Sequence, residues 1–454
     1  MTNSKPYADV FSSAFEEEKA FLDFLRERDD LGGWTKRHIR DLRIVPLDDV
    51  ATPEVDPLPG YTLDDLQAIL TDTMANTQLM LKSKDLVVPI RNCAVKTLLE
   101  RAKISGPALN RVEKPVLARI LNHCLRIANG EALLRISDGK LSAVHGGDSS
   151  DYAVLEMPEL FSRTVRYLNN HFSGCSFAGG FYDHSSATAV WEISDEALVQ
   201  SYQDALDQHE IAHGTLKPAV RLSTSDVGIS GANLYPTLYI GGREATIALG
   251  SPLKLEHRGE KTMKDFERLL DMLYSQYQFA IGNLARLLNI EISNPVNCML
   301  GVCKHIGVGK KLAYEATEQF KAQNGNEPCT AHEIYYGMSE IAFMVTCRGA
   351  SGTKIVQTEE TVARALAVRW QEYDILILIS DGQPADTDYY GTEAEADLRG
   401  IKREYTNKGI LMFAAAIGDD KPNIQRIYQD GFLDITDLHK LPANLTRLIS
   451  QYIK

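Results

Sequence analysis

The chain has 454 residues, of which 44% are hydrophobic and 24% are charged, and these values are typical of a folded globular protein with two to three domains. They exclude wholesale disorder, collagen and long coiled-coil fibres. The sequence has no apolar run near the roughly 18 residues that a bilayer span needs, and residues 1–11 lack the basic-then-apolar order of a signal peptide. We therefore expect a cytoplasmic protein without membrane contact.

The net charge is -13, from 48 Lys and Arg against 61 Asp and Glu. An acidic chain does not attract phosphate backbones over its whole surface, so any contact with nucleic acid must be local. The seven cysteines are scattered and show no Cys-x-x-Cys spacing, a pattern typical of reduced, mostly buried thiols.

Residues 1–60 are expected to form a helical N-terminal segment and a linker. Apolar residues between Phe11 and Leu25 recur near the helical period, and Gly32-Gly33 ends the pattern. Four prolines between Val45 and Gly60 predict an extended linker, after which the spacing over 63–81 predicts another helix.

Residues 61–260 are expected to form an α+β domain, and residues 261–373 a helical subdomain. Strands are predicted at 132–136, 187–193, 220–224, 238–240 and 245–249. The helices of the subdomain are predicted over 262–288 without a break, 310–323 and 330–346.

Residues 374–454 are expected to form an α/β, Rossmann-like module. The predicted strand 374–379 is apolar from Ile375 onward, as in strands buried in a parallel sheet, and the strands 410–417 and 432–435 follow it. Helices are predicted at 393–407 and 441–452, so strand and helix alternate. Three such strands leave open edges, which predicts an incomplete sheet.

The same stretch carries a resemblance to a known family. Asp381-Gly-Gln-Pro384, the run 409–418 and Phe432-Leu-Asp-Ile-Thr436 resemble the second half of a von Willebrand factor A-type (VWA) domain. Tyr389-Tyr390-Gly391 and Ile427-Tyr428 are similar to bacterial VWA proteins of the cobaltochelatase and nitric oxide reductase activation type. The resemblance covers about residues 349–454 and implies a module that binds a protein partner, commonly a ring-shaped AAA+ ATPase.

The VWA resemblance also implies a divalent cation site. The family holds the ion with an Asp-x-Ser-x-Ser motif, a Thr and an Asp at the position of Asp381, because carboxylate and hydroxyl oxygens suit Mg²⁺. The nearest sequences to the first motif are Asp226-x-Gly228-x-Ser230 and Asp183-x-Ser185-x-Ala187. We expect the Mg²⁺ ligands to be Asp381, Thr353, Asp226 and Ser230. The alternative is that Asp381 and Gly382 form only a strand-to-helix turn.

The earlier part of the chain resembles a different family. Ser223-Thr-Ser-Asp-Val-Gly228, Asn294-Pro295 with Cys303, and Cys329-Thr-Ala-His-Glu-Ile-Tyr335 through Glu359-Glu360 are similar to a phage and plasmid family of unknown function. This resemblance implies a mobile-element origin. The two resemblances meet near Asp374, as in a chain fused from two gene pieces.

Two further motifs indicate other chemistries. His209-Glu210-Ile211-Ala212-His213 matches the His-Glu-x-x-His pattern, in which two imidazoles on one helix face bind zinc and the Glu activates water. Gly214 and Pro218 stop the predicted helix and no third ligand is evident, so we interpret the motif as a polar helix end and do not expect zinc.

A basic stretch precedes the linker, with Trp34 as a stacking face beside it. Its cations could contact a nucleic-acid backbone, or they could form a solvated helix face, as charge runs usually do. The residues are Lys36, Arg37, Arg40 and Arg43.

We interpret the sequence as a non-enzymatic mobile-element protein with a VWA-like module that binds a protein partner. A nucleic-acid-binding phage protein acting in DNA replication or recombination is one alternative. A zinc hydrolase built on His209 and His213 is the other.

Overall fold

The chain divides into two compact units, Met1–Val368 and Arg369–Lys454. The computed structural model describes residues 5–49, 55, 57–240, 246–348, 352–368, 374–380, 385–386, 389–407, 410–416 and 421–434. Both units mix helices and strands, and the larger sheets are antiparallel.

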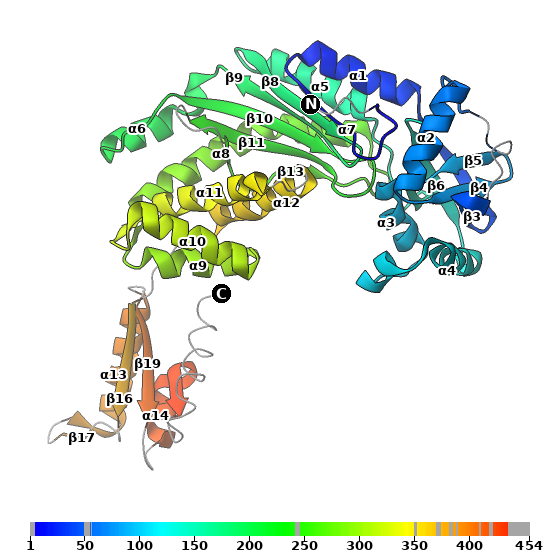
Figure 1. Cartoon of the computed structure of the whole chain (residues 1–454). Coiled ribbons are helices and arrows are strands. Elements are labelled where there is room, and N and C mark those ends of the chain that lie inside the picture. The colour runs from blue at the N-terminus through cyan, green and yellow to red at the C-terminus, as the bar shows by residue number, and fades with distance from the viewer. Residues whose placement is uncertain are drawn as a thin grey trace. The chain divides into compact units, whose positions relative to one another are not determined.

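An antiparallel sheet is the centre of the first unit (Figure 1). Its strand order is β1-β8-β9-β10-β11-β12, and β13 also pairs with β11. The strands are β1 (Ser12–Phe15), β8 (Cys175–Asp183), β9 (Ala187–Ile193), β10 (Leu216–Thr224), β11 (Ala232–Ile240), β12 (Thr246–Ala248) and β13 (Leu253–Leu255). Every residue of β10 except Lys217 is buried, which requires cover on both faces of the sheet.

The register shows which helices supply this cover. Val220 on β10 lies opposite Trp191 on β9, and the Trp191 ring packs near Phe161 of α5 (Met157–His171). Ala219, the residue before Val220, points to the other face of the sheet. Its backbone N–H donates to the Tyr277 hydroxyl of α8 (Leu273–Arg286). Successive strand residues point to opposite faces, so α5 and α8 cover opposite sides of the sheet.

A smaller lobe is joined to this sheet within the first unit. It contains the antiparallel sheets β2-β6-β7 and β3-β4-β5. These strands are β2 (Gly33–His38), β6 (Glu131–Ser137), β7 (Lys140–Gly146), β3 (Arg43–Pro46), β4 (Leu79–Ser83) and β5 (Leu86–Pro89). Helices α3 (Asn92–Arg101) and α4 (Lys114–Ile127) pack on them around one continuous apolar core, and α2 (Leu63–Ala75) packs on Met80 of β4 in a second apolar cluster.

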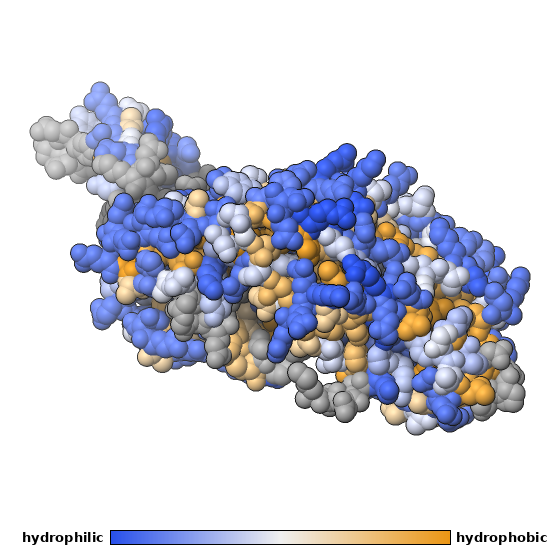
Figure 2. Space-filling view, turned by 90° about the horizontal axis from the view of Figure 1, so that it is seen from above, coloured by the Kyte–Doolittle hydropathy of each residue, from blue (hydrophilic) through white to orange (hydrophobic). Residues whose placement is uncertain are grey.

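The remaining helices of the first unit follow the sheet in the sequence. They are α7 (Met263–Asp271), α8, α9 (Pro295–Ile306), α10 (Lys310–Asn324), α11 (Ala331–Cys347) and α12 (Gly352–Ala363), and α1 (Glu18–Asp30) and α6 (Gln200–Gln208) precede them. Figure 2 shows one face of the molecule, on which hydrophilic side chains surround smaller apolar patches. Among the described residues, no helix is long and apolar enough to cross a membrane.

Several sequence predictions need correction in this unit. The predicted N-terminal helix is wrong for residues 12–15, 33–38 and 43–46, which form strands. Residues 79–81, predicted to continue a helix, lie on strand β4, and the helix predicted over 262–288 is interrupted at Met272. Long-range strand pairing accounts for the first case: residues 12–15 pair with β8, where Phe15 lies opposite Gly180, and the Phe15 ring packs against Phe21 and Phe24 of α1.

In the second unit, the predicted strands and the first helix are confirmed. Strands β16 (Asp374–Ser380), β19 (Ile410–Ala416) and β20 (Phe432–Asp434) form a parallel sheet in the order β16-β19-β20. Helix α13 (Gly391–Asn407) connects the first two strands, and α14 (Lys421–Tyr428) connects the second to the third. The predicted helix 441–452 lies outside the described residues.

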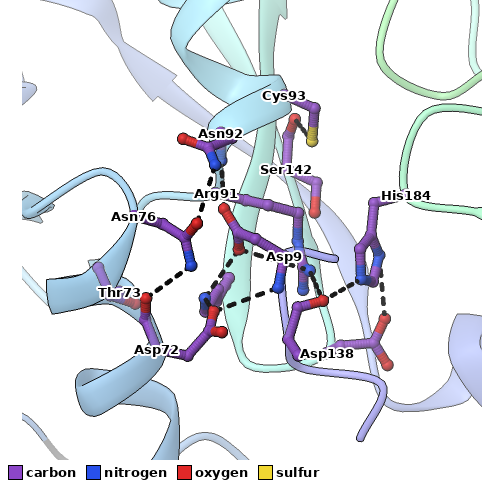
Figure 3. Close-up of polar contacts among 12 residues, drawn as sticks. Asp9, Asp72, Thr73, Asn76, Arg91, Asn92, Cys93, Asp138, Ser142 and His184 are labelled. Carbon is purple, nitrogen blue, oxygen red and sulfur yellow. Dashed lines mark hydrogen bonds and ion pairs between the residues drawn. The ribbon is translucent and has the colours of Figure 1, made fainter. Parts of the chain in front are cut away.

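A buried charge cluster joins the lobe, the N-terminal segment and the large sheet (Figure 3). The Lys140 ammonium is fully buried and binds both Asp9, at 2.8 Å, and Asp72 of α2. The other Asp9 oxygen accepts the Asn92 N–H at 2.8 Å. We call the charged groups gathered here the buried charge cluster: Asp9, Arg28, Asp72, Arg91, Asp138 and Lys140.

The cluster also reaches α1 and the β8–β9 turn. Arg28 of α1 donates to Asp138 at 2.9 Å, and His184 is hydrogen-bonded to the carbonyl of Ala8 at 2.9 Å. Burial raises the pKa of the Asp138 carboxyl and lowers the pKa of the His184 imidazole well below its ordinary value. Residues from widely separated stretches of the chain therefore meet at one point.

We expect Lys140→Met to destabilise the first unit by about 3–5 kcal/mol, because it leaves the Asp9 and Asp72 carboxylates without their buried cation. Chemical denaturation followed by circular dichroism measures this change. The control is Lys96→Met, an exposed residue of α3 in an i,i+4 pair with Glu100, which should change stability by only about 0.5 kcal/mol. Equal effects of the two substitutions would contradict the role of the cluster.

Candidate nucleic-acid interface

The four cations predicted from the sequence lie on strands and a short turn, not on one helix face. Lys36 and Arg37 are on β2, Arg40 is in the turn after it, and Arg43 begins β3. Lys36, Arg40 and Arg43 are exposed, and Arg37 is half-buried because it donates to Asp85 at 2.9 Å. The helix expected in the alternative is therefore wrong for this stretch, whereas the exposure of three of the cations agrees with a solvated surface.

Two lysines that the sequence reasoning missed extend this basic group. Lys82 on β4 lies directly opposite Arg43 in the antiparallel register, and both side chains are exposed. Lys84 is exposed in the turn between β4 and β5, beside the Asp85 that Arg37 binds. The only signal in the sequence was Lys-Ser-Lys at 82–84. The pairing of β4 with β3, which places these lysines near Arg43, is visible only in the structure.

The group continues to the end of α4. Arg40 donates to the carbonyl of Ala128 at 3.2 Å and also binds the Asn129 side chain, just after the exposed Arg126. We call the exposed cations connected in this way the basic surface: Lys36, Arg40, Arg43, Lys82, Lys84 and Arg126.

The charge of this region contrasts with that of the whole chain. Residues 33–46 and 79–127, which we call the basic lobe, contain 14 Lys and Arg against four Asp and Glu, whereas the chain carries a net charge of -13. Helix α2, which packs on the same lobe, adds Asp64, Asp65 and Asp72, of which Asp72 binds Lys140. The strands β2–β5 and helices α3 and α4 are therefore a local cationic region on an acidic protein.

A cleft of about 520 Å³ lies beside the basic lobe. One wall is the end of α3, with Arg101 and Lys103, and β7 supplies Val144, His145 and Gly146. The other wall is the turn 228–231 together with Lys254 and Arg258. Ser230, predicted as a metal ligand, lies in this turn.

Three stacked rings support the cleft. Tyr152 lies between His145 and His257, with ring centroids at 3.9 Å and 5.2 Å and nearly parallel planes. Both faces of the Tyr152 ring are therefore covered and neither is open for stacking on a base. Burial lowers the pKa of His145 to about 4, so its imidazole is neutral near pH 7.

The structure describes only some of the candidate metal ligands, and the two candidate carboxylates that it describes contact other groups. The Asp226 carboxylate is buried and lies 3.2 Å from Arg135 Nε, an ion pair that engages its Oδ2 atom. Asp183 Oδ1 accepts the N–H groups of Ser185 and Ser186 and so closes a turn. Thr353 is in the first turn of α12, and Asp381 and Gly382 lie outside the described residues. Within the part of the chain that the structure describes, no group of three or more His, Cys, Asp and Glu side chains is arranged to hold a metal.

The two histidines of the His-Glu-x-x-His motif do not share a helix face. Helix α6 ends at Gln208, and Glu210 has a positive φ of 56°. His209 Nε2 lies 3.3 Å from Asn289 Oδ1, and His213 Nε2 lies 3.3 Å from Asp207 Oδ1. The helix therefore ends before the motif, earlier than the stop at Gly214 that the sequence predicted.

Comparisons with protein-family models, curated proteins and solved structures gave no match to this chain. The resemblances to VWA proteins and to the phage and plasmid family therefore stay predictions.

A group of carboxyl side chains lies where the basic lobe meets the large sheet. Arg135 of β6 binds Asp226 and also Asp29 of α1, each at 3.2 Å. Glu156, directly before α5, lies beside Asp29 and Asp226. Burial, and next the charge of Asp29, raise the pKa of Glu156 from 4.5 to about 7. One arginine thus faces three acidic groups, and protonation of Glu156 relieves their repulsion.

Glu156 gives the protein a predicted pH dependence. Between pH 4.5 and 7 folded Glu156 keeps a proton that the unfolded chain has lost, so its contribution to stability falls as the pH rises. We expect the free energy of unfolding of Glu156→Gln to rise by about 1–2 kcal/mol relative to that of wild type between pH 5 and pH 8. This figure is reduced because the Glu156 side chain is half-exposed. Urea unfolding at both pH values measures the difference.

The exposed control Glu16→Gln should show no comparable change with pH. A difference between wild type and Glu156→Gln that stays constant from pH 5 to pH 8 would contradict the raised pKa.

Proposed function

We propose that this protein binds nucleic acid through the basic surface. The observation that carries the proposal is the concentration of 14 cationic against four acidic residues in the basic lobe of a chain with net charge -13. Cationic side chains that contact phosphates release counterions, and this term supplies most of sequence-independent affinity. The predicted resemblance to phage and plasmid proteins points to the same class of partner.

The pairing of Arg43 with Lys82 supports this proposal. Both side chains are exposed on neighbouring strands, so a phosphate backbone that crosses these two strands could contact both. The acidic remainder of the chain would repel the same polyanion, which directs it to the basic lobe.

We expect Lys82→Glu/Lys84→Glu to weaken binding of a labelled DNA oligonucleotide about tenfold or more at ~0.1 M salt. The slope of log affinity against log salt should become shallower by about two, one for each lost phosphate contact. The fold should not suffer, because the new carboxylate at position 82 would face Arg43 as an opposite charge, which contributes about 0.2–1 kcal/mol. Fluorescence anisotropy and thermal melting measure the two effects.

The matched control is Lys19→Glu/Lys311→Glu, which makes the same change of charge at exposed positions in the first turns of α1 and α10. If both double variants bind DNA equally weakly, the loss of affinity is due to the change in net charge. That result, or unchanged binding by Lys82→Glu/Lys84→Glu, would refute the proposal.

The second candidate function belongs to the second unit. We propose a Rossmann-like, VWA-like module that binds a protein partner, such as an AAA+ ATPase, with Mg²⁺ held by Asp381. The supporting observation is the parallel pairing of β16 with β19, in which Ser380 lies opposite Ala416. Open α/β sheets bind ligands at the carboxyl ends of their strands, and Asp381 directly follows this end in the sequence.

Asp381→Asn tests this candidate, because it keeps an acceptor oxygen and the preference for a turn but removes the charge. We expect Mg²⁺ to raise the melting temperature of the wild type and not that of Asp381→Asn, since an ion that binds only the folded state stabilises it. A wild-type melting temperature unchanged by Mg²⁺ would refute the Mg²⁺ site and leave the alternative that Asp381 only forms a turn.

A further inference from the structure

The basic surface continues into the cleft beside the basic lobe through one asparagine. The Arg40 guanidinium binds the side chain of Asn129, and Arg101 of α3 donates to the Asn129 carbonyl at 3.2 Å. Arg101 is also part of the cleft wall. A nucleic-acid backbone that follows the basic surface therefore arrives at the mouth of the cleft.

Cations from two separate segments line the cleft. Arg101 and Lys103 belong to the end of α3 and the residues after it, whereas Lys254 and Arg258 belong to β13 and the residues after it. Lys103, Lys254 and Arg258 are exposed. A phosphate group that enters the cleft would therefore find cations from both segments in its lining.

The acidic residues of the cleft limit how much backbone it accepts. Glu100, Asp151 and Glu256 also line it, and Lys254 lies 3.5 Å from Glu360. Four cations against three carboxylates favour one phosphate but disfavour a run of them. The charge pattern therefore fits a short anionic segment.

The inner part of the cleft is uncharged and has hydrogen-bonding atoms. His145 Nε2 is hydrogen-bonded to the carbonyl of Asp226 at 2.8 Å, and this bond places the proton on Nε2. The Nδ1 atom is then an acceptor, and among the described residues it has no hydrogen-bond partner. Ser230 adds a hydroxyl, and Val144 and Ile229 add apolar surface.

Glycines allow the turn 228–231 to approach its neighbours closely. Gly228 has a φ of 73°, and a Cβ atom there would lie 3.1 Å from His145 Cε1. A Cβ atom on Gly231 would lie 2.3 Å from the carbonyl oxygen of Leu255. The turn is therefore held against both His145 and β13, which gives the cleft a defined shape.

We propose that this cleft receives one unpaired nucleotide of a single strand whose backbone follows the basic surface. The inference rests on the proposed nucleic-acid binding and adds a preference for single strands. A volume of about 520 Å³ is in the size range of small-ligand pockets, which accept a nucleotide but not a base-paired duplex. Unpaired bases leave their edges free for hydrogen bonds with groups such as His145 Nδ1.

The test compares a labelled single-stranded oligonucleotide with a hairpin duplex of the same sequence by fluorescence anisotropy. We expect Ser230→Tyr, which fills the cleft without changing its charge, to weaken single-strand binding about tenfold or more and to leave duplex binding within about twofold. Lys103→Glu/Arg258→Glu should reduce single-strand affinity more than duplex affinity. The control Lys19→Glu/Lys311→Glu measures the effect of net charge alone, and melting temperatures confirm that each variant folds.

The outcomes separate this inference from the proposed function. If Lys82→Glu/Lys84→Glu loses binding but the cleft variants keep the wild-type preference for single strands, the cleft proposal fails and the proposed function stands. If Lys82→Glu/Lys84→Glu binds like wild type, the proposed function fails and the cleft proposal fails with it. Binding of free deoxyadenosine monophosphate as tight as that of the oligonucleotide would also overturn the cleft proposal, because the ligand would then be a free nucleotide.

Discussion

The first unit depends on the contact of one fully buried lysine with two carboxylates. Lys140, at the start of β7, binds Asp9 of the N-terminal segment and Asp72 of α2. A buried charge is tolerated only when it is paired and hydrogen-bonded, so these three stretches must meet for the fold to form. Asp9 also accepts the Asn92 N–H before α3. The relative position of the lobe and the large sheet follows from this cluster, and the cleft lies along that junction.

The same junction separates the buried charges of the protein from its exposed ones. Inside, Arg135 is surrounded by Asp29, Asp226 and Glu156, an arrangement that holds the two parts together. Outside, Arg40 of the basic surface donates to the backbone carbonyl of Ala128 and to the amide oxygen of Asn129. Paired buried charges contribute to the structure, whereas the exposed Arg40 is hydrogen-bonded to neutral oxygen atoms.

The two proposed functions occupy different units. Nucleic-acid binding uses side chains of the first unit, and its evidence is the charge and the geometry of the described residues. The VWA-like candidate uses the parallel strands of the second unit, together with Asp381 in its sequence. The two are compatible, because a nucleic-acid-binding body joined to a partner-binding module would bring a second protein to a nucleic acid.

The sequence by itself determined the elements whose signal is local. Strand β9 and helix α10 are near their predicted limits, and β16, β19 and β20 follow from apolar runs that suit a parallel sheet. It also determined that a nucleic-acid contact must be local and that Lys36, Arg37, Arg40 and Arg43 were candidates for it.

Only the tertiary structure decided which distant residues meet. Residues 12–15 read as helix by spacing, yet they pair with β8, which lies far later in the chain. Lys82 became part of the basic surface through its pairing with Arg43, and Asp226 was found in an ion pair with Arg135, which lies far earlier in the chain. Such contacts depend on the register of strands and on the burial of charge, and neither is encoded in the spacing of neighbouring residues.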